Sequence, residues 1–182
     1  MVDFRRSAPG EIRYKADLAL RSGRSRLDRM SEKTYFDELE RVEARPDAAE
    51  MRRQLLAYEK YEAEVAGRWP EEVASDIDEI ITCHFDDIEK ALAYVILAAS
   101  QSDDPDFLAL VACGNLENVL RDPSPELLDR IVAEARKSAR FRWLLSHPFK
   151  VAIAPRAWEA IEKFRIAGPH EEPCAETLPP RS

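Results

Sequence analysis

The stretch Asp86-Asp-Ile-Glu-Lys-Ala-Leu-Ala-Tyr-Val-Ile-Leu-Ala-Ala99 decides the fold class of this 182-residue chain. Two aspartates open it, and from Ala91 onward every position is apolar or aromatic. A helix without a polar face needs apolar neighbours on all sides, so we expect this helix in the middle of the fold. The apolar run is too short to cross a bilayer.

Helical spacing continues on both sides of this segment. In residues 125–139 the apolar positions recur at i, i+1, i+4, i+5 and i+8, which is the stripe of an amphipathic helix. Applied along the chain, the same criterion predicts helices over 11–22, 32–44, 46–66, 70–82, 86–100, 105–112, 116–121, 125–139, 141–146 and 155–166. Short turns between them favour antiparallel hairpins, so we predict an all-α fold, either an irregular multi-helix bundle or a short α-solenoid. The sequence has no regular repeat period, which makes the solenoid the weaker option.

Proline and glycine mark helix ends. Pro105 follows Asp104, and a proline at the first helical position loses no needed hydrogen bond while the aspartate caps the first turn. Gly114 lies where a helix would end in a left-handed residue. We therefore expect one helix to close at Gly114 and Asn115 to cap the next one.

The composition limits which classes of protein the chain can belong to. The chain is 45% hydrophobic and 34% charged with a net charge of −8, which is typical of a globular protein rather than a disordered one. Cys83, Cys113 and Cys174 are odd in number and widely spaced, so they do not form a disulfide framework. The amino terminus has no apolar signal segment, and we expect a cytoplasmic protein without a membrane anchor.

Charge and proline content divide the chain into three expected parts. These are a charged helical arm over 1–66, a helical core domain over 67–167 and a disordered tail over 168–182, which has four prolines and little that is apolar. The arm starts with a basic stretch, because residues 1–34 contain nine bases and five acids. Residues 70–112 contain eleven acids and one base, for a net charge of −10.

The familiar patterns of catalytic and metal sites are missing from the sequence. Cys83 and His84 are adjacent and would point about 100° apart on a helix. There is no Cys-x-x-Cys, no Glu-x-x-His, no nucleophile turn and no glycine-rich phosphate loop. We expect Cys83 and Cys113 to be small buried hydrophobic residues. We predict no catalytic residue, no cofactor and no metal site.

Three carboxylates of the acidic segment share one helix face. Glu72, Asp76 and Glu79 are spaced at i, i+4 and i+7. Such a face could bind a divalent cation, although a solvated acidic face is the commoner arrangement. We expect these residues to form an interaction surface for a basic protein partner, with their charge governing association rate more than stability.

The most individual part of the sequence is Leu108-Ala-Leu-Val-Ala-Cys-Gly-Asn-Leu-Glu-Asn-Val-Leu120, followed by Ile131-Val-Ala-Glu-Ala-Arg136 and Arg140-Phe-Arg-Trp-Leu-Leu145. In this order, over about residues 70–146, the chain resembles a family of small bacterial all-helical domains of unknown function. The resemblance implies an all-α fold and carries over no catalytic residue.

Three polar residues of these motifs have two possible roles. Asn115, Glu117 and Arg142 either stabilise helix ends or converge on a ligand. Paired acidic and basic residues near helix ends are common stabilising features, so we favour the structural role.

These observations favour a non-enzymatic protein-interaction module, including an immunity or antitoxin-type inhibitor, because an acidic surface can steer onto a basic active site. The alternative is an enzyme or small-ligand-binding helical domain with a scattered polar site. A third option is a nucleic-acid-binding accessory protein that uses the basic amino-terminal arm, which the acidic pI of about 5.1 opposes. The sequence identifies neither the partner nor the oligomeric state.

Overall fold

The computed structural model describes residues 37–65 and 75–181. The predicted helix over 11–22, the basic stretch of the arm and Glu72 lie outside the described residues. The structure therefore neither supports nor opposes nucleic-acid binding through that basic stretch.

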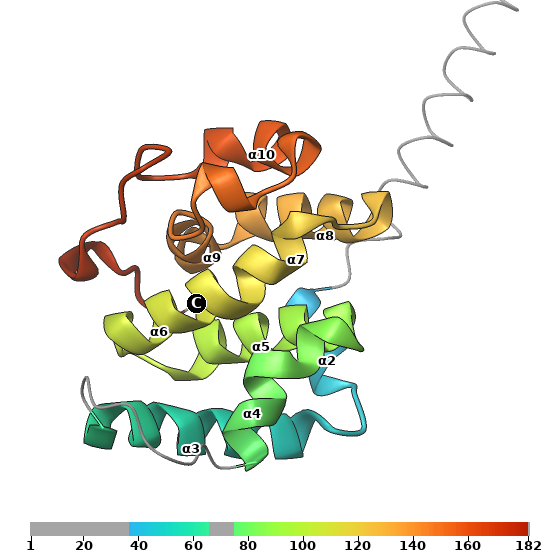
Figure 1. The fold of residues 1–182 in the computed structure, drawn as a ribbon, viewed down its shortest axis with the longest axis vertical. Coiled ribbons are helices and arrows are strands. Elements are labelled where there is room, and N and C mark those ends of the chain that lie inside the picture. Colours follow the sequence, from blue (N-terminus) through green and yellow to red (C-terminus); the bar gives the residue numbers. More distant parts are fainter. Residues whose placement is uncertain (1–36, 66–74, 182) are drawn as a thin grey trace, which may run out of the picture. The chain divides into compact units, whose positions relative to one another are not determined.

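The described residues form helices joined by short turns, and no β-strand occurs within 37–65 and 75–181. The α-helices are α2 (Glu38–Glu43), α3 (Ala48–Val65), α4 (Ser75–Thr82), α5 (Ile88–Gln101), α6 (Pro105–Val111), α7 (Glu117–Arg121), α8 (Pro125–Lys137), α9 (Ala139–Leu144) and α10 (Pro155–Ile161) (Figure 1). Four 3₁₀ turns are η1 (Cys83–Phe85), η3 (Lys150–Ala152), η4 (Glu162–Phe164) and η5 (Ala175–Thr177), and a π-helical turn is η2 (Ala112–Leu116). The all-α prediction is confirmed, and each helix predicted from residue 46 onward has a counterpart.

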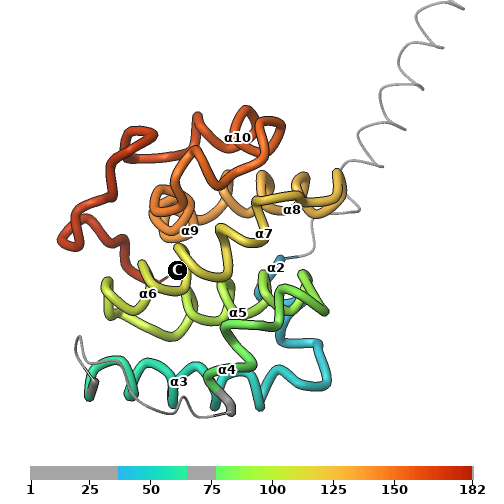
Figure 2. Tube along the Cα trace, viewed as in Figure 1, coloured from blue at the N-terminus to red at the C-terminus, as the bar shows by residue number. Residues whose placement is uncertain are grey.

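Helix α5 lies at the centre of the fold, as its apolar sequence predicts. Every residue from Ala91 to Ala98 is buried. The helix begins at a cap, because the Asp87 carboxylate accepts a hydrogen bond of 2.9 Å from the backbone N–H of Lys90. Helices α2, α3, α6, α7 and α9 all contact α5. Figure 2 shows α3 on one side of α5 and α8, α9 and α10 on the other, an irregular bundle.

Residues 37–65 are part of the helical body. Helix α2 packs against α5, and α3 packs against both α4 and α5. Their apolar residues Val42, Met51 and Leu55 are buried in the common core. The arm boundary expected after residue 66 is corrected by this packing, because the structure divides after Phe36. The sequence of α2 and α3 is highly charged, so the few apolar residues that pack them against α5 did not indicate a place in the core.

The segment 168–181, called the tail below, is folded onto the helical body. The indole N–H of Trp143 donates to the carbonyl of Cys174 at 3.4 Å. The guanidinium of Arg140 donates to the carbonyl of Pro179. The prediction of disorder from residue 168 onward is therefore corrected. It failed because the tail is held through its backbone oxygens, which every sequence provides, by side chains that lie elsewhere in the chain.

Helices α6 and α7 are continuous through the π-helical turn η2, which contains Gly114. The prediction that Gly114 closes a helix is wrong. Asn115 caps nothing, because it is 4% exposed and its side-chain amide donates a 2.8 Å hydrogen bond to the carbonyl of Ile80. The wider turn of a π-helix keeps the helix intact while Asn115 faces the core.

Candidate functional site

The turn between α4 and α5 carries an exposed hydrophobic pair. Phe85 is 77% exposed, and Ile81, one helical turn earlier, is 45% exposed. His84 fixes the turn, because its Nδ1–H donates to the carbonyl of Ile81 at 2.9 Å and its ring lies 4.0 Å from the ring of Phe85, centroid to centroid. An ordered turn thus holds a large aromatic side chain in water.

Two carboxylates that have no partner in the described part of the chain lie on either side of this hydrophobic pair in the sequence. Asp78 on α4 and Asp86 just after η1 are both exposed. Within the described part of the chain, neither carboxylate makes a hydrogen bond or an ion pair. Asp78, Ile81, Phe85 and Asp86 together are called the acidic corner below.

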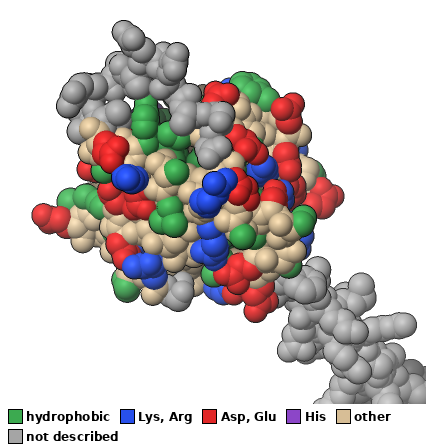
Figure 3. All heavy atoms as spheres, turned by 90° about the horizontal axis from the view of Figure 1, so that it is seen from below, with side chains coloured by type: hydrophobic (Ala, Val, Ile, Leu, Met, Phe, Trp, Pro, Cys, Tyr) green, Lys and Arg blue, Asp and Glu red, His purple; other side chains and the backbone are tan. Residues whose placement is uncertain are grey.

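Other acids of the same segment are engaged in the fold. Glu89 accepts from Arg130 at 2.6 Å, and Asp87 caps α5. On the face shown in Figure 3, acidic, basic and hydrophobic side chains lie interspersed. The acidic corner differs because its carboxylates have no such neutralising contact among the described residues.

The structure describes only part of the interaction surface predicted at Glu72, Asp76 and Glu79. Glu72 and the side chain of Asp76 lie outside the described residues. Glu79 is half-buried, and its carboxylate accepts from Gln54 at 2.8 Å and from the ammonium of Lys90. These two hydrogen bonds, that of Lys90 first, hold the pKa of Glu79 below its ordinary value. Glu79 therefore joins α4 to α3 and α5 as well as contributing charge.

The predicted ligand cluster of Asn115, Glu117 and Arg142 is held by separate contacts. Asn115 bonds to the carbonyl of Ile80, and Arg142 donates to the carbonyl of Ala135 at 3.0 Å. Glu117 is half-buried, and among the described residues no hydrogen bond or ion pair joins any two of the three. Asn115 therefore links η2 to α4, and Arg142 stabilises the junction of α8 with α9.

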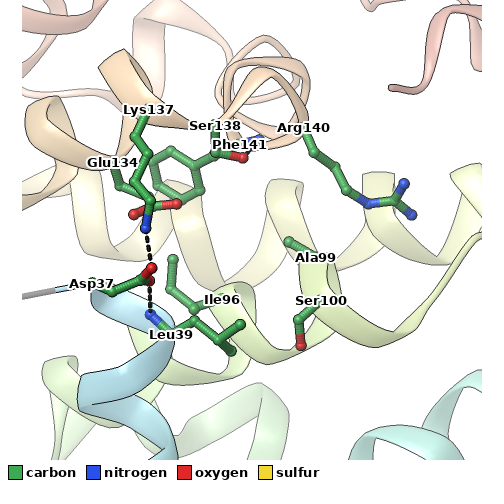
Figure 4. A pocket seen from close by; sticks show the side chains of 10 residues that line it. All are labelled: Asp37, Leu39, Ile96, Ala99, Ser100, Glu134, Lys137, Ser138, Arg140 and Phe141. Atoms are coloured by element: carbon green, nitrogen blue, oxygen red, sulfur yellow. Dashed lines mark hydrogen bonds and ion pairs between the residues drawn. The ribbon is translucent and has the colours of Figure 1, made fainter. Parts of the chain in front are cut away.

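A cavity of about 210 Å³ lies between α2, α5 and the junction of α8 with α9 (Figure 4). Its apolar lining comes from Leu39, Ile96 and Phe141. No motif marks this cavity, because its lining comes from helices that are far apart in the sequence.

The charged rim of the cavity contains one paired and one unpaired carboxylate. Asp37 accepts from the ammonium of Lys137, and this hydrogen bond holds the pKa of Asp37 below its ordinary value. The carboxylate of Glu134 has no hydrogen-bond partner among the described residues, and burial raises its pKa. The guanidinium of Arg140 points away from this pair in Figure 4 and is bound to the carbonyls of Ser102 and Pro179.

The cysteines have the environments of structural residues. Cys83 is buried and Cys113 is half-buried, and burial raises the pKa of each thiol to about 11. Both are therefore protonated at neutral pH, which makes them poor nucleophiles. Across 37–65 and 75–181, no three His, Cys, Asp or Glu residues are grouped so as to hold a metal ion. Nor does this part of the chain contain a helix long and apolar enough to cross a membrane.

Comparison with known proteins gives one match. The model of a family of unknown function, DUF6869, matches residues 64–168, which is more than half of the chain. The matched region contains α4 to α10 and therefore the acidic corner. None of the curated proteins and none of the solved structures matches the chain. The resemblance to a family of unknown function, drawn from the motifs between residues 108 and 145, is thereby confirmed.

Proposed function

We propose a function for this chain, which belongs to the family of unknown function DUF6869: it is a non-enzymatic interaction module that binds a basic protein through the acidic corner. The observation that carries this proposal is Phe85, which is 77% exposed and next in the sequence to Asp86. The carboxylates of Asp86 and Asp78 have no partner among the described residues. Residues that dominate binding energy at protein interfaces are commonly aromatic anchors within a polar or charged rim.

The two parts of the acidic corner have different tasks in this proposal. The carboxylates of Asp78 and Asp86 belong to a segment with a net charge of −10, and their field raises the rate at which a basic surface arrives. Phe85 and Ile81 bury apolar area once contact is made, which slows dissociation. Glu79 contributes less to the field because Lys90 neutralises it.

The biological form that suits this surface is an inhibitor of the immunity or antitoxin type, which would cover the basic active site of its target. A cytoplasmic location is part of the proposal, since Cys83, Cys113 and Cys174 are all free thiols, as in a reducing compartment.

Affinity capture with the full chain tests the proposal. The unmodified chain is compared with Phe85→Ala, with the double variant Asp78→Asn/Asp86→Asn, and with Val151→Ala, which removes an equally exposed apolar side chain outside the acidic corner. We expect a basic protein that binds the unmodified chain and Val151→Ala and is lost or weakened with the other two variants. With the captured protein, the Asp variants should slow association by an amount that shrinks with added salt, and Phe85→Ala should speed dissociation.

Melting temperatures distinguish lost binding from lost folding. The four altered side chains are exposed, so each of the three variants should melt within about 2 °C of the unmodified chain, the shift that about 0.5 kcal/mol produces in a domain of this size. The proposal fails if all four proteins capture the same set of partners, or if the captured partner has no basic surface.

The cavity favours a second candidate function, the binding of a small ligand. Glu134 offers a half-buried carboxylate without a partner among the described residues, and Phe141 and Ile96 offer an apolar wall. This lining suits a small molecule that combines an amine or hydroxyl donor with an apolar part. Thermal-shift measurements with small aliphatic and aromatic amines test it, because ligands that stabilise the unmodified chain should lose their effect on Glu134→Gln.

A further inference from the structure

Part of the tail, residues 173–181, lies across a surface made by α9 and the loop between α5 and α6. The backbone of this segment is extended at Cys174 (φ −63°, ψ 137°) and at Leu178 (φ −59°, ψ 117°), with the turn η5 between them. These angles are close to those of polyproline II. In the turn itself the carbonyl of Cys174 accepts from the backbone N–H and the hydroxyl of Thr177, at 2.9 and 2.6 Å, and the carbonyl of Ala175 accepts from the N–H of Leu178. The carbonyl of Pro179, beyond the turn, accepts from Arg140 of α9.

The surface provides two buried donors that meet this segment. Trp143 is 1% exposed, and its indole N–H donates to the carbonyl of Cys174 at 3.4 Å and to the hydroxyl of Thr177 at 3.3 Å. Arg140 is 3% exposed and donates to the carbonyl of Pro179. In the other direction, Arg181 of the segment pairs with a carboxylate of the loop.

The donors are positioned without help from the segment. Arg140 also donates to the carbonyl of Ser102 and, at 3.1 Å, to the carboxylate of Asp103. Both acceptors lie in the loop between α5 and α6, so the guanidinium keeps its orientation when the segment leaves. Trp143 is held on α9 with its ring packed against His147, centroids 4.3 Å apart. A site whose donors are fixed in advance loses little entropy on binding.

The segment itself is attached by few side chains. Only Pro173, Leu178 and Pro179 are half-buried, and its other described residues are exposed. Leu178 alone among them packs against the hydrophobic core. A chain segment with so few buried apolar contacts opens at a lower free energy than the helices beneath it.

We propose that this surface is a recognition site for extended proline-containing peptides of the Leu-Pro-Pro-Arg type, and that residues 178–181 are its resident, exchangeable occupant. Within residues 178–181 the carbonyl of Pro179 accepts from Arg140, Leu178 packs against the core, and Arg181 binds Asp103 and the carbonyl of Gln101 at 2.8 Å. Trp143 holds the turn that precedes them. Docking of a preformed extended segment on such a surface is the recognition mode used for proline-rich ligands. The resident segment competes with an incoming peptide at an effective concentration of the order of millimolar. A partner protein that presents the same chemistry would bind by displacing it.

A synthetic peptide with the sequence of residues 172–181 and Cys174→Ser tests this inference on the full-length chain. The variant Leu178→Asp/Arg181→Glu releases the resident segment by removing its apolar anchor and by repelling Asp103. We expect this variant to keep the helical circular dichroism of the unmodified chain and to bind the peptide at least about ten-fold more tightly, because the resident competitor is gone. A control peptide that carries the same two substitutions should not bind.

Hydrogen exchange on the unmodified chain gives an independent check. The indole N–H of Trp143 should exchange through local opening, faster than the amides of α5, and more slowly when the peptide is added in excess, because the bound peptide covers the same N–H. The inference is overturned if the peptide binds neither protein, if it binds both equally, or if the control peptide binds as well. Loss of helix in the release variant, or indole exchange as slow as that of α5, would show that the segment is a fixed part of the fold and would also overturn it.

Discussion

Replacing Arg130 by methionine tests how the structure holds α2 against the body. The guanidinium of Arg130 on α8 donates to both carboxylate oxygens of Glu38 on α2, at 2.8 and 2.7 Å. It also donates to both oxygens of Glu89 on α5, at 2.8 and 2.6 Å. The Glu38 side chain is only 5% exposed, whereas that of Glu89 is 47% exposed. The cost of losing Arg130 therefore falls mainly on Glu38.

The expected magnitude follows from this burial. Removing one partner of a buried ion pair costs about 3–5 kcal/mol because the other charge stays buried. Arg41, 3.6 Å from Glu38, still neutralises part of the Glu38 charge in the variant, which lowers this cost. Losing the exposed contact with Glu89 adds less than about 1 kcal/mol. We expect about 3 kcal/mol for Arg130→Met. In a domain of this size that lowers Tm by about 6–12 °C.

Urea and thermal unfolding followed by far-ultraviolet circular dichroism measure this cost. Glu89→Gln is the matched control and should cost less than about 1 kcal/mol. The double variant Glu38→Gln/Arg130→Met should recover much of the loss, because no buried charge remains. If Arg130→Met is as stable as Glu89→Gln, the buried pair does not hold α2 in place and the reasoning is refuted.

Two further predictions concern His147 and Gly114. His147 is 2% exposed, both ring nitrogens lack partners among the described residues, and burial, with the nearby Arg165, lowers its pKa to about 4. The unfolded chain takes up this proton near pH 6.5 and the folded chain only near pH 4, so stability should fall by up to about 3 kcal/mol as the pH drops across that window. Urea unfolding at several pH values should show this fall, and His147→Phe should remove it. Gly114→Ala should stabilise the chain by about 0.5–1 kcal/mol, because an added Cβ meets nothing within 4 Å and alanine favours the helix. A lower melting temperature for this variant would show that the position needs glycine.

Features that depend on neighbouring residues could be predicted from the sequence. The predicted cap at Asp104 forms, because its carboxylate accepts from the backbone N–H of Asp106 at 2.9 Å. Ser124 caps α8 in the same way, accepting from the N–H of Leu127 at 3.2 Å. The uniformly apolar sequence of α5 likewise places this helix in the core. Helix caps and apolar periodicity depend on residues within one or two helical turns of each other, so both can be identified from a single sequence.

The π-helical turn shows how a local pattern can support the wrong element. Buried residues between 107 and 120 recur in pairs at intervals of four: Phe107, Leu108, Val111, Ala112, Asn115, Leu116, Val119 and Leu120. An α-helix turns about 100° per residue, so a stripe with this spacing drifts by about 40° at each repeat. A wider π-helical turn at η2 absorbs part of that drift and keeps all eight residues buried. The same spacing also fits two helices separated at Gly114, which is the prediction that failed.

The candidate sites depend on contacts between distant residues, and those contacts could not be predicted. The sequence identifies 70–112 as strongly acidic but not which carboxylates stay free. Glu79 is bound by Gln54 and Lys90. The pairing of each acid depends on where α3 and α8 lie. The cavity and the docking of the tail could not be predicted for the same reason, since each depends on segments that are distant in the sequence and meet only in the fold.

Two arginines, the buried Arg140 and the half-buried Arg165, bind backbone carbonyls at the ends of helices in this fold. A fold of short helices has many helix ends, and each end leaves backbone carbonyls without partners. Arg165 donates to the carbonyls of Leu145, Ser146, Pro148 and Gly168, and Arg140 serves the loop after α5 in the same way. Burying these guanidinium groups is costly, and it is offset only where several acceptors surround each one. Arg140 also reaches the exposed carboxylate of Asp103, whereas Asp78 and Asp86 have no base within contact distance among the described residues.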